Sequence, residues 1–277
     1  MVALALVAVA AEALTAHHHR RPIHARDELL ATAGVALGHA ALRLVEAGIV
    51  AVPMALAAAH RPWTIDASTW SGALGLFLAY EFAYYWYHRA AHRVRWLWAT
   101  HAVHHSTTRL NLTAALRLGW TGAISGHFLF FLPLVAIGFS PTAVAAMATL
   151  DLVWQFFIHT EMVPSLGVLE AVLDTPRHHA VHHARNEACL DRNFGGILIV
   201  FDRLFGTFAA APPEPLVFGL VGRAPSTSVL AVVFGEWRRL FADLRRAPSL
   251  AAALTVLFGP PGAGSLSLDP PRPSETP

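Results

Sequence analysis

The sequence predicts an all-α fold: an integral membrane helical bundle with a histidine-rich cap that faces the cytoplasm. The 277-residue chain is 55% hydrophobic and 14% charged, whereas soluble domains carry about 25% charged residues. Apolar stretches close to the length of a bilayer-spanning helix recur along the chain. Two dense runs of histidine, at residues 88–105 and 178–183, follow such stretches.

Five apolar stretches are expected to form the helices of the bundle. Residues 1–16 predict a marginal first helix, and residues 29–59 predict a long second helix. Three further stretches predict membrane-spanning helices, because a span needs about 20 mostly apolar residues. They cover residues 69–87, 121–139 and 141–159. The last two form a hairpin that returns the chain to the side of the membrane that it left.

Arginine sets the expected orientation. All 20 basic residues are arginine. Many of them lie in the connections that carry histidine, and the positive-inside bias places such connections in the cytoplasm. The absence of lysine and the abundance of alanine indicate a GC-rich coding bias, which favours a bacterial source. The expected location is therefore the bacterial inner membrane, crossed several times, with the histidine site facing the cytoplasm.

The chain is expected to divide into three regions. Residues 1–68 form N-terminal membrane helices and a loop, and residues 69–210 form the histidine-bearing domain. Residues 211–277 form an amphipathic segment and a tail rich in proline, glycine and serine. Such a composition buries too little apolar surface to fold, so the tail is expected to be disordered.

The histidines follow helical spacings, with one HxxxH and two HxxHH motifs. Residues three and four apart share one face of a helix, so each motif is expected to present one convergent set of imidazoles. Neutral imidazole is the commonest protein ligand of iron, copper and zinc. Eight such histidines exceed the needs of one tetrahedral ion, so a di-metal cap is predicted. The predicted ligands are His88, His92, His101, His104, His105, His179, His182 and His183.

Neighbouring residues are predicted to complete the site. His159, at the end of the returning helix, is expected to be a further ligand, and His178 a supporting group or an extra ligand. Polar side chains near the motifs are expected to hold the N–H groups of the ligand imidazoles, as the partners of metal ligands do. These side chains are Glu81, Asp151, Gln155, Asn186, Asp191, Asn193 and Asp202.

Other features narrow the class of protein. The net charge is +2 with histidine neutral, and no long basic tract occurs, so no nucleic-acid partner is expected. Cys189 is the only cysteine, which excludes a disulfide framework and a thiolate metal site. A metal-dependent membrane hydrolase and a non-catalytic metal-binding membrane protein are the alternatives. No HExxH motif supports the first, and the second is expected to spread its histidines through the depth of the membrane.

A family resemblance is carried by six segments in order: HRAAH, HAVHH, NLTAALR, QFFIHTE, TPRHHAVHHARN and DRNFGGILIVFDRLFGTF. They resemble the fatty acid hydroxylase/sterol desaturase superfamily of membrane di-iron proteins. Within it, the chain is most similar to the alkylglycerol monooxygenase-like branch and to bacterial sterol desaturase family proteins. The resemblance covers residues 74–262 and implies that the region 69–210 is the catalytic domain.

The resemblance also implies an activity. Two Fe ions are held by the eight motif histidines, and O2 is the co-substrate for hydroxylation or desaturation of a fatty acyl, sterol or ether lipid. An electron-donor protein or a small-molecule reductant is implied as a partner, and tetrahydrobiopterin is the reductant associated with the alkylglycerol branch. The residues themselves leave hydroxylation and desaturation open, because both begin with abstraction of a hydrogen atom from carbon.

Overall fold

A computed structural model of the chain describes residues 2–262. Within them the prediction of an all-α fold is confirmed, because the chain forms no strand there beyond two isolated bridges. The predicted disordered tail lies, from residue 263 onward, outside the described residues. The α-helices are α1 (Val2–His18), α2 (Arg26–His60), α3 (Trp70–Arg93), α4 (Arg95–His101), α5 (Gly122–Ser125), α6 (Leu132–Ala136), α7 (Pro141–Ile158), α8 (Pro176–His183), α9 (Val200–Leu204), α10 (Val229–Arg246) and α11 (Leu250–Phe258). The 3-10 helices are η1 (His104–Ser106), η2 (Leu112–Leu116), η3 (His127–Phe130), η4 (Gly167–Ala171) and η5 (Glu187–Cys189).

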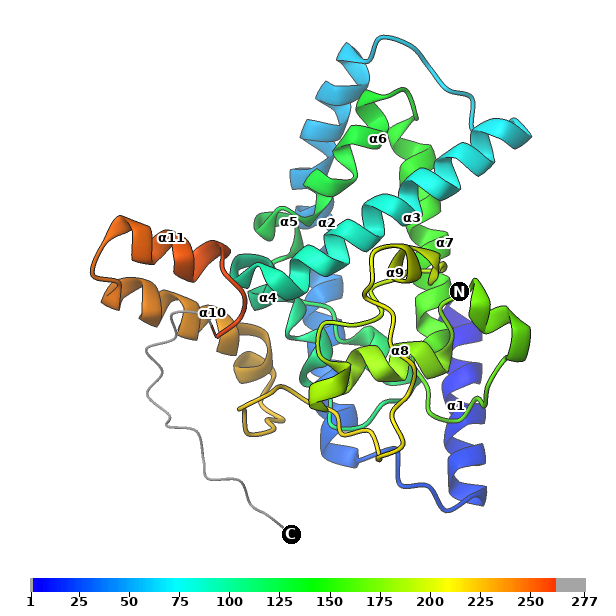
Figure 1. Ribbon diagram of the computed structural model, residues 1–277, viewed down its shortest axis with the longest axis vertical. Helices are drawn as coiled ribbons and strands as arrows, with labels where there is room; N and C mark the ends of the chain where they lie inside the picture. Colours follow the sequence, from blue (N-terminus) through cyan, green and yellow to red (C-terminus); the bar gives the residue numbers. More distant parts are fainter. Residues whose placement is uncertain (1, 263–277) are drawn as a thin grey trace.

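Helices α2, α3 and α7 form the frame of the molecule, and α3 crosses in front of α2 (Figure 1). The start of α3 is capped by the Thr69 hydroxyl, which accepts a hydrogen bond from the Gly72 N–H at 3.1 Å. The start of α7 is capped in the same way by Ser140, and Pro141 occupies the first turn, where a missing N–H costs nothing. These caps fix where the two helices that lead to histidine begin.

Two of the described helices, α2 and α7, are long and apolar enough to cross a membrane. The prediction of a spanning helix over residues 121–139 is wrong. The chain there forms α5, η3 and α6, which fold back against α2 and α3. Gly126 ends α5 in a left-handed conformation (φ 86°), and Pro133 near the start of α6 lacks the N–H that a continuous helix would need.

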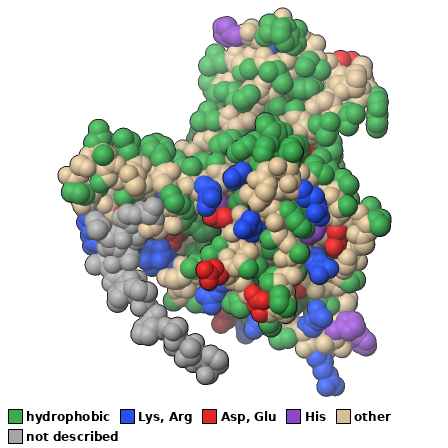
Figure 2. Space-filling model, in the orientation of Figure 1, with side chains coloured by type: hydrophobic (Ala, Val, Ile, Leu, Met, Phe, Trp, Pro, Cys, Tyr) green, Lys and Arg blue, Asp and Glu red, His purple; other side chains and the backbone are tan. Residues whose placement is uncertain are grey.

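An aromatic core joins α3, α6 and α7. Tyr80 stacks on Phe131 with ring centroids 4.9 Å apart, and Tyr84, Val135 and Met147 are buried beside them. Hydrophobic side chains dominate the upper part of the surface, whereas arginine and acidic side chains gather over its middle and lower parts (Figure 2). Helices α4 and α8, which carry histidine motifs, lie below α6 and near the middle of the view (Figure 1).

Candidate metal centre

The structure gathers histidine nitrogens into two buried groups. In each group the ligand atoms lie within 4.8 Å of one another. The first group consists of His88, His92, His101, His105 and His182. The second group consists of His104, His159, His179 and His183. These are the nine histidines that the sequence predicts as ligands.

Each HxxHH motif is divided between the two groups, contrary to the expectation of one convergent set per motif. His101 and His105 face the first group, whereas His104 faces the second. In α8 the middle histidine of the motif, His182, belongs to the first group, whereas His179 and His183 belong to the second. The reason is that α4 ends at His101, so η1 changes the turn, and that adjacent positions on a helix point about 100° apart.

The two groups adjoin. The rings of His105 and His183 belong to different groups, yet their centroids lie 4.4 Å apart at an interplanar angle of 22°. His104 and His105 lie edge to face, with centroids 5.5 Å apart. Two ions held in these groups would therefore be neighbours, as in two-metal centres.

Backbone carbonyls fix the tautomer of several imidazoles. The Nδ1 atom of His88 lies 3.0 Å from the Phe194 carbonyl oxygen, and that of His182 lies 2.9 Å from the Arg192 carbonyl oxygen. His159 Nδ1 makes the same contact with the carbonyl of Gln155. Because a carbonyl only accepts, each Nδ1 carries the proton and donates. Each Nε2 therefore presents a bare lone pair to the interior of its group.

The spacing of the Nε2 atoms fits a bound metal. His88 and His105 each place Nε2 3.1 Å from that of His101, and His159 places it 3.0 Å from that of His104. Metal–imidazole bonds of about 2.0–2.1 Å at right angles give an edge of about 3 Å. Lone pairs this close repel one another unless a cation lies between them. The donor set is all nitrogen, which suits iron, copper or zinc.

Burial keeps the imidazoles in the form that binds metal. Loss of hydration lowers the pKa of His104 to about 4 and that of His182 to about 3. Both side chains are therefore neutral at pH 7, and no proton has to leave before a metal binds.

Asp174 is a buried partner that the sequence reasoning missed. Its Oδ2 lies 3.3 Å from Nδ1 of His179, and the residue has no exposed surface. Burial raises the pKa of the Asp174 carboxyl well above its usual value, so its ionised form needs a nearby positive charge, which a metal bound to His179 would supply. The sequence position of Asp174 could have indicated this role, because Asp174 lies two residues before Pro176, where a helix begins, and five residues before His179.

Most of the predicted supporting side chains act on the backbone and do not contact imidazole. Glu81 was expected to orient a ligand, but its Oε2 accepts hydrogen bonds from the N–H groups of Ile197 and Leu198, both at 2.8 Å. Asp202 accepts from the N–H groups of Phe194 and Gly195. They hold the loop whose Phe194 carbonyl in turn holds His88.

Asn193, Asn186 and Asp191 lie around the same loop. The Asn193 amide donates to the carbonyls of His178 and Ala209, so it ties the loop to α8. Asn186 bonds the backbone of Pro215 and Val217 and contacts no histidine of either group. Asp191 lies nearer to a ligand imidazole, with its Oδ1 3.9 Å from Nδ1 of His92, which is longer than a hydrogen bond.

His178 belongs to neither group. Its Nδ1 lies 3.3 Å from the Leu173 carbonyl oxygen, and its ring packs edge-on against Phe208. The structure therefore does not bring His178 together with the nine predicted ligands, because its side chain leaves α8 on another face than that of His179.

Asp151 and Gln155 form a chain of hydrogen bonds that ends on α3. The Gln155 amide donates to Asp151 at 2.6 Å, and its oxygen accepts from the Tyr84 hydroxyl at 2.9 Å. Tyr84 packs against His88 with ring centroids 5.4 Å apart. Gln155 therefore supports His159 through its backbone and His88 through Tyr84, whereas direct side-chain contacts were expected.

Replacing Glu81 by alanine is expected to destabilise the loop at residues 194–198. Two buried N–H groups lose their acceptor, at about 1–3 kcal/mol each. Glutamine keeps one acceptor oxygen, so Glu81→Gln is expected to retain most of the stability. Thermal unfolding of the detergent-purified variants measures both effects, and equal losses in the two variants would contradict this role.

The part of the chain that carries the two histidine groups is similar in sequence to known proteins. Residues 73–207 match the sequence model of the family described as fatty acid hydroxylase, and this segment contains all nine histidines of the two groups. Residues 73–207 are therefore a fatty acid hydroxylase domain, and the resemblance predicted from the sequence is confirmed.

Within that class, the chain is similar to alkylglycerol monooxygenases. The protein of Danio rerio is 40% identical over 201 residues, which cover 73% of this chain and 44% of the relative. The protein of Homo sapiens is 39% identical over 203 residues, with 73% and 43% coverage. The ornithine lipid hydroxylase OlsE of Rhizobium tropici is 31% identical over 151 residues, with 54% and 45% coverage. The chain thus spans less than half the length of these relatives. No solved structure matches it.

Proposed function

We propose that the chain is a membrane di-iron oxidoreductase that uses O2 to hydroxylate a lipid. The observation that carries the proposal is the pair of adjoining histidine groups inside a fatty acid hydroxylase domain. The relatives are named as a monooxygenase and a lipid hydroxylase, which favours hydroxylation over desaturation and an ether lipid or an ornithine lipid as the substrate class.

Two irons, when bound, supply an oxidant strong enough to remove hydrogen from an unactivated C–H bond. The protein's part is to hold and to shield. The carbonyls of Phe194, Arg192 and Gln155 orient the imidazoles, and burial keeps them neutral. Tyr80 and Tyr84 place the aromatic core beside His88, and this side of the site is assigned to the hydrocarbon chain of the lipid.

The same proposal assigns a place in the cell. The exposed apolar face of α2 faces lipid. The middle and lower parts of the molecule, where the charged side chains and the histidine groups lie, face the cytoplasm of a bacterial inner membrane, where an electron-donor protein or a small-molecule reductant delivers electrons. Charged surface over the lower part of the molecule supports this orientation (Figure 2).

The test compares lipids of a bacterial host that expresses the chain with those of a host that expresses the His104→Ala variant, with and without air. Hydroxylation adds 16 mass units, whereas desaturation removes two. We expect the +16 product only with the unsubstituted chain, only in air, and two irons per purified chain. A product that forms equally without air, or equally with the variant, would sink the proposal. Cleavage products whose summed mass exceeds that of the lipid by one water molecule would indicate the hydrolase alternative.

A further inference from the structure

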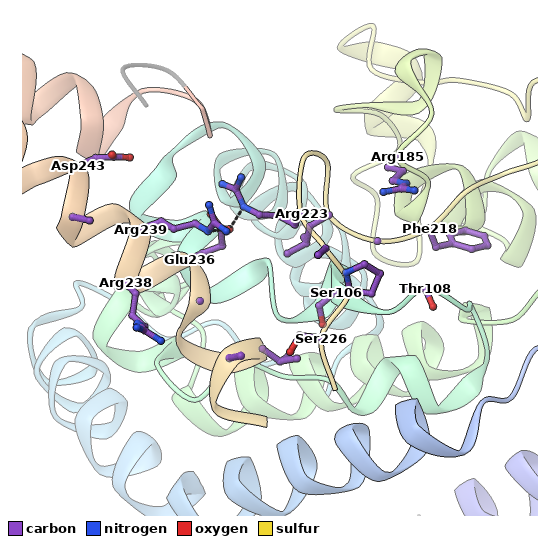
Figure 3. A pocket seen from close by; sticks show the side chains of 18 of the residues that line it. Ser106, Thr108, Arg185, Phe218, Arg223, Ser226, Glu236, Arg238, Arg239 and Asp243 are labelled. Atoms are coloured by element: carbon purple, nitrogen blue, oxygen red, sulfur yellow. Dashed lines mark hydrogen bonds and ion pairs between the residues drawn. The ribbon is translucent and has the colours of Figure 1, made fainter. Parts of the chain in front are cut away.

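A second site is suggested by a cleft of about 830 Å³ beside the histidine cap. One wall is α10, and the opposite wall is formed by the segments that follow the two HxxHH motifs, with Ser106, Thr108 and Arg185 (Figure 3). The loop 217–226 and α10 lie outside the segment that matches the hydroxylase family. The cleft is therefore partly built from a region for which the family match gives no role.

The lining of the cleft is cationic. It contains five arginines and two carboxylates, which leaves a net charge of +3 (5 − 2). The five are Arg185, Arg223, Arg238, Arg239 and Arg246. Guanidinium groups stand on both walls, with Arg185 next to Phe218 on one side and Arg238 and Arg239 on α10 (Figure 3).

Both carboxylates of the lining are already paired with arginine. Glu236 is bound by Arg223 at 2.8 Å, and Arg239 lies 3.9 Å from the same oxygen. Asp243 is bound at 2.5 Å by Arg95, a buried arginine that is not part of the lining. One carboxylate is therefore shared by two arginines of the lining, and the other is already compensated from inside the protein.

The rest of the lining is suited to an organic ligand. Val217, Phe218, Leu220 and Val232 supply apolar surface, and Thr108 and Ser226 supply hydroxyl groups. A volume of this size accommodates a small organic molecule and not just an inorganic ion. Arginine binds phosphate and carboxylate oxygens through two parallel hydrogen bonds, and a phosphate carries more charge against a +3 lining than a single carboxylate does.

We propose that this cleft binds a phosphate-bearing organic anion, with the phosphate between Arg185 and the arginines of α10 and the organic part against Phe218 and Val232. Its source is a lipid headgroup or a soluble phosphate ester. Ser106 directly follows the histidine at 105, and Arg185 lies two residues after the histidine at 183. A ligand in the cleft therefore lies against residues that follow both HxxHH motifs.

Binding is tested on the full-length chain in detergent with two probes. Glycerol 3-phosphate represents soluble esters, and dihexanoyl phosphatidic acid represents headgroups. Isothermal titration calorimetry measures the occupancy. We expect saturable binding of at least one probe, weakened at high salt by screening. Saturation by the first alone identifies a soluble ligand, whereas saturation by the second alone identifies a lipid.

The variant that removes the site is Arg185→Gln with Arg238→Gln, since both side chains are exposed and their loss leaves the core intact. We expect binding at least about tenfold weaker, which corresponds to about 1.4 kcal/mol. Arg177→Gln, an exposed arginine of α8 outside the cleft, is the matched control and is expected to bind as the unsubstituted chain does. Absence of saturable binding of both probes, or equal binding by the double variant, overturns the proposal. Unchanged metal content and melting temperature of the double variant establish that it is folded.

Discussion

Alanine at position 179 is expected to abolish turnover, with a loss beyond about 100-fold. Substitution of a residue that only supports a metal ligand lowers metal affinity or activity about 10–100-fold. His179 is proposed to be a ligand itself, so a larger loss of activity is expected. Its Nε2 lies 2.9 Å from that of His159 and 3.1 Å from that of His183, so its removal opens the second group on two edges. The measurement is product formation together with metal content of the purified variant.

The neighbouring histidine provides a matched control. His178→Ala changes the same side chain on the same helix, one residue away, but His178 packs on Phe208 and lies outside both groups. Its metal content is expected to equal that of the unsubstituted chain, with activity reduced only as far as stability is. Equal metal loss in the two variants would show that the assignment of α8 histidines to groups is wrong.

The second large effect is expected from Asp174→Asn. The change keeps the shape of the side chain and removes the charge that faces His179 Nδ1 at 3.3 Å. In a fully buried position no water replaces that charge. Metal affinity is therefore expected to fall about 10–100-fold, measured by competition with a chelator.

Asp191→Asn is the control for the loss of a carboxylate near an imidazole. Asp191 lies 3.9 Å from His92 Nδ1, but its side chain is 36% exposed and is bound by Arg93. Solvent screens such a charge, so a small change in affinity is expected. If both variants bound metal like the unsubstituted chain, the buried carboxylate would have no role in holding the metal.

The sequence predicted the histidines of the site well, because ligand spacing is a local property. HxxxH and HxxHH are read directly from neighbouring residues, and His159 was identified by its place at the end of a helix. The division of each motif between two groups was not predicted. In α8 it arises within one continuous helix, because adjacent positions point about 100° apart. In the first motif α4 also ends at His101, and packing decides that boundary.

The supporting contacts were harder to predict for a different reason. His88, His182 and His159 are held by backbone carbonyls, and every residue has one, so side-chain patterns carry no signal for them. The side chains that were singled out, such as Glu81 and Asp202, shape the loop that presents those carbonyls. Similarly, the apolar composition of residues 121–139 predicted a span, whereas Gly126 and Pro133 divide that stretch into short helices.

The division of the motifs has a thermodynamic consequence. When α8 is ordered by an ion in the second group, His182 is positioned for an ion in the first group as well. In the same way, when residues 101–105 are ordered by an ion in the first group, His104 is positioned for the second. Binding of the first ion would therefore already cost most of the conformational entropy that the chain loses when the site is ordered. The second ion would bind at a smaller entropy cost, so that the two binding events would be positively cooperative. Protein that holds one ion would then be a minor species beside empty and fully loaded protein. On the proposed function, a form with a single iron would thereby be avoided.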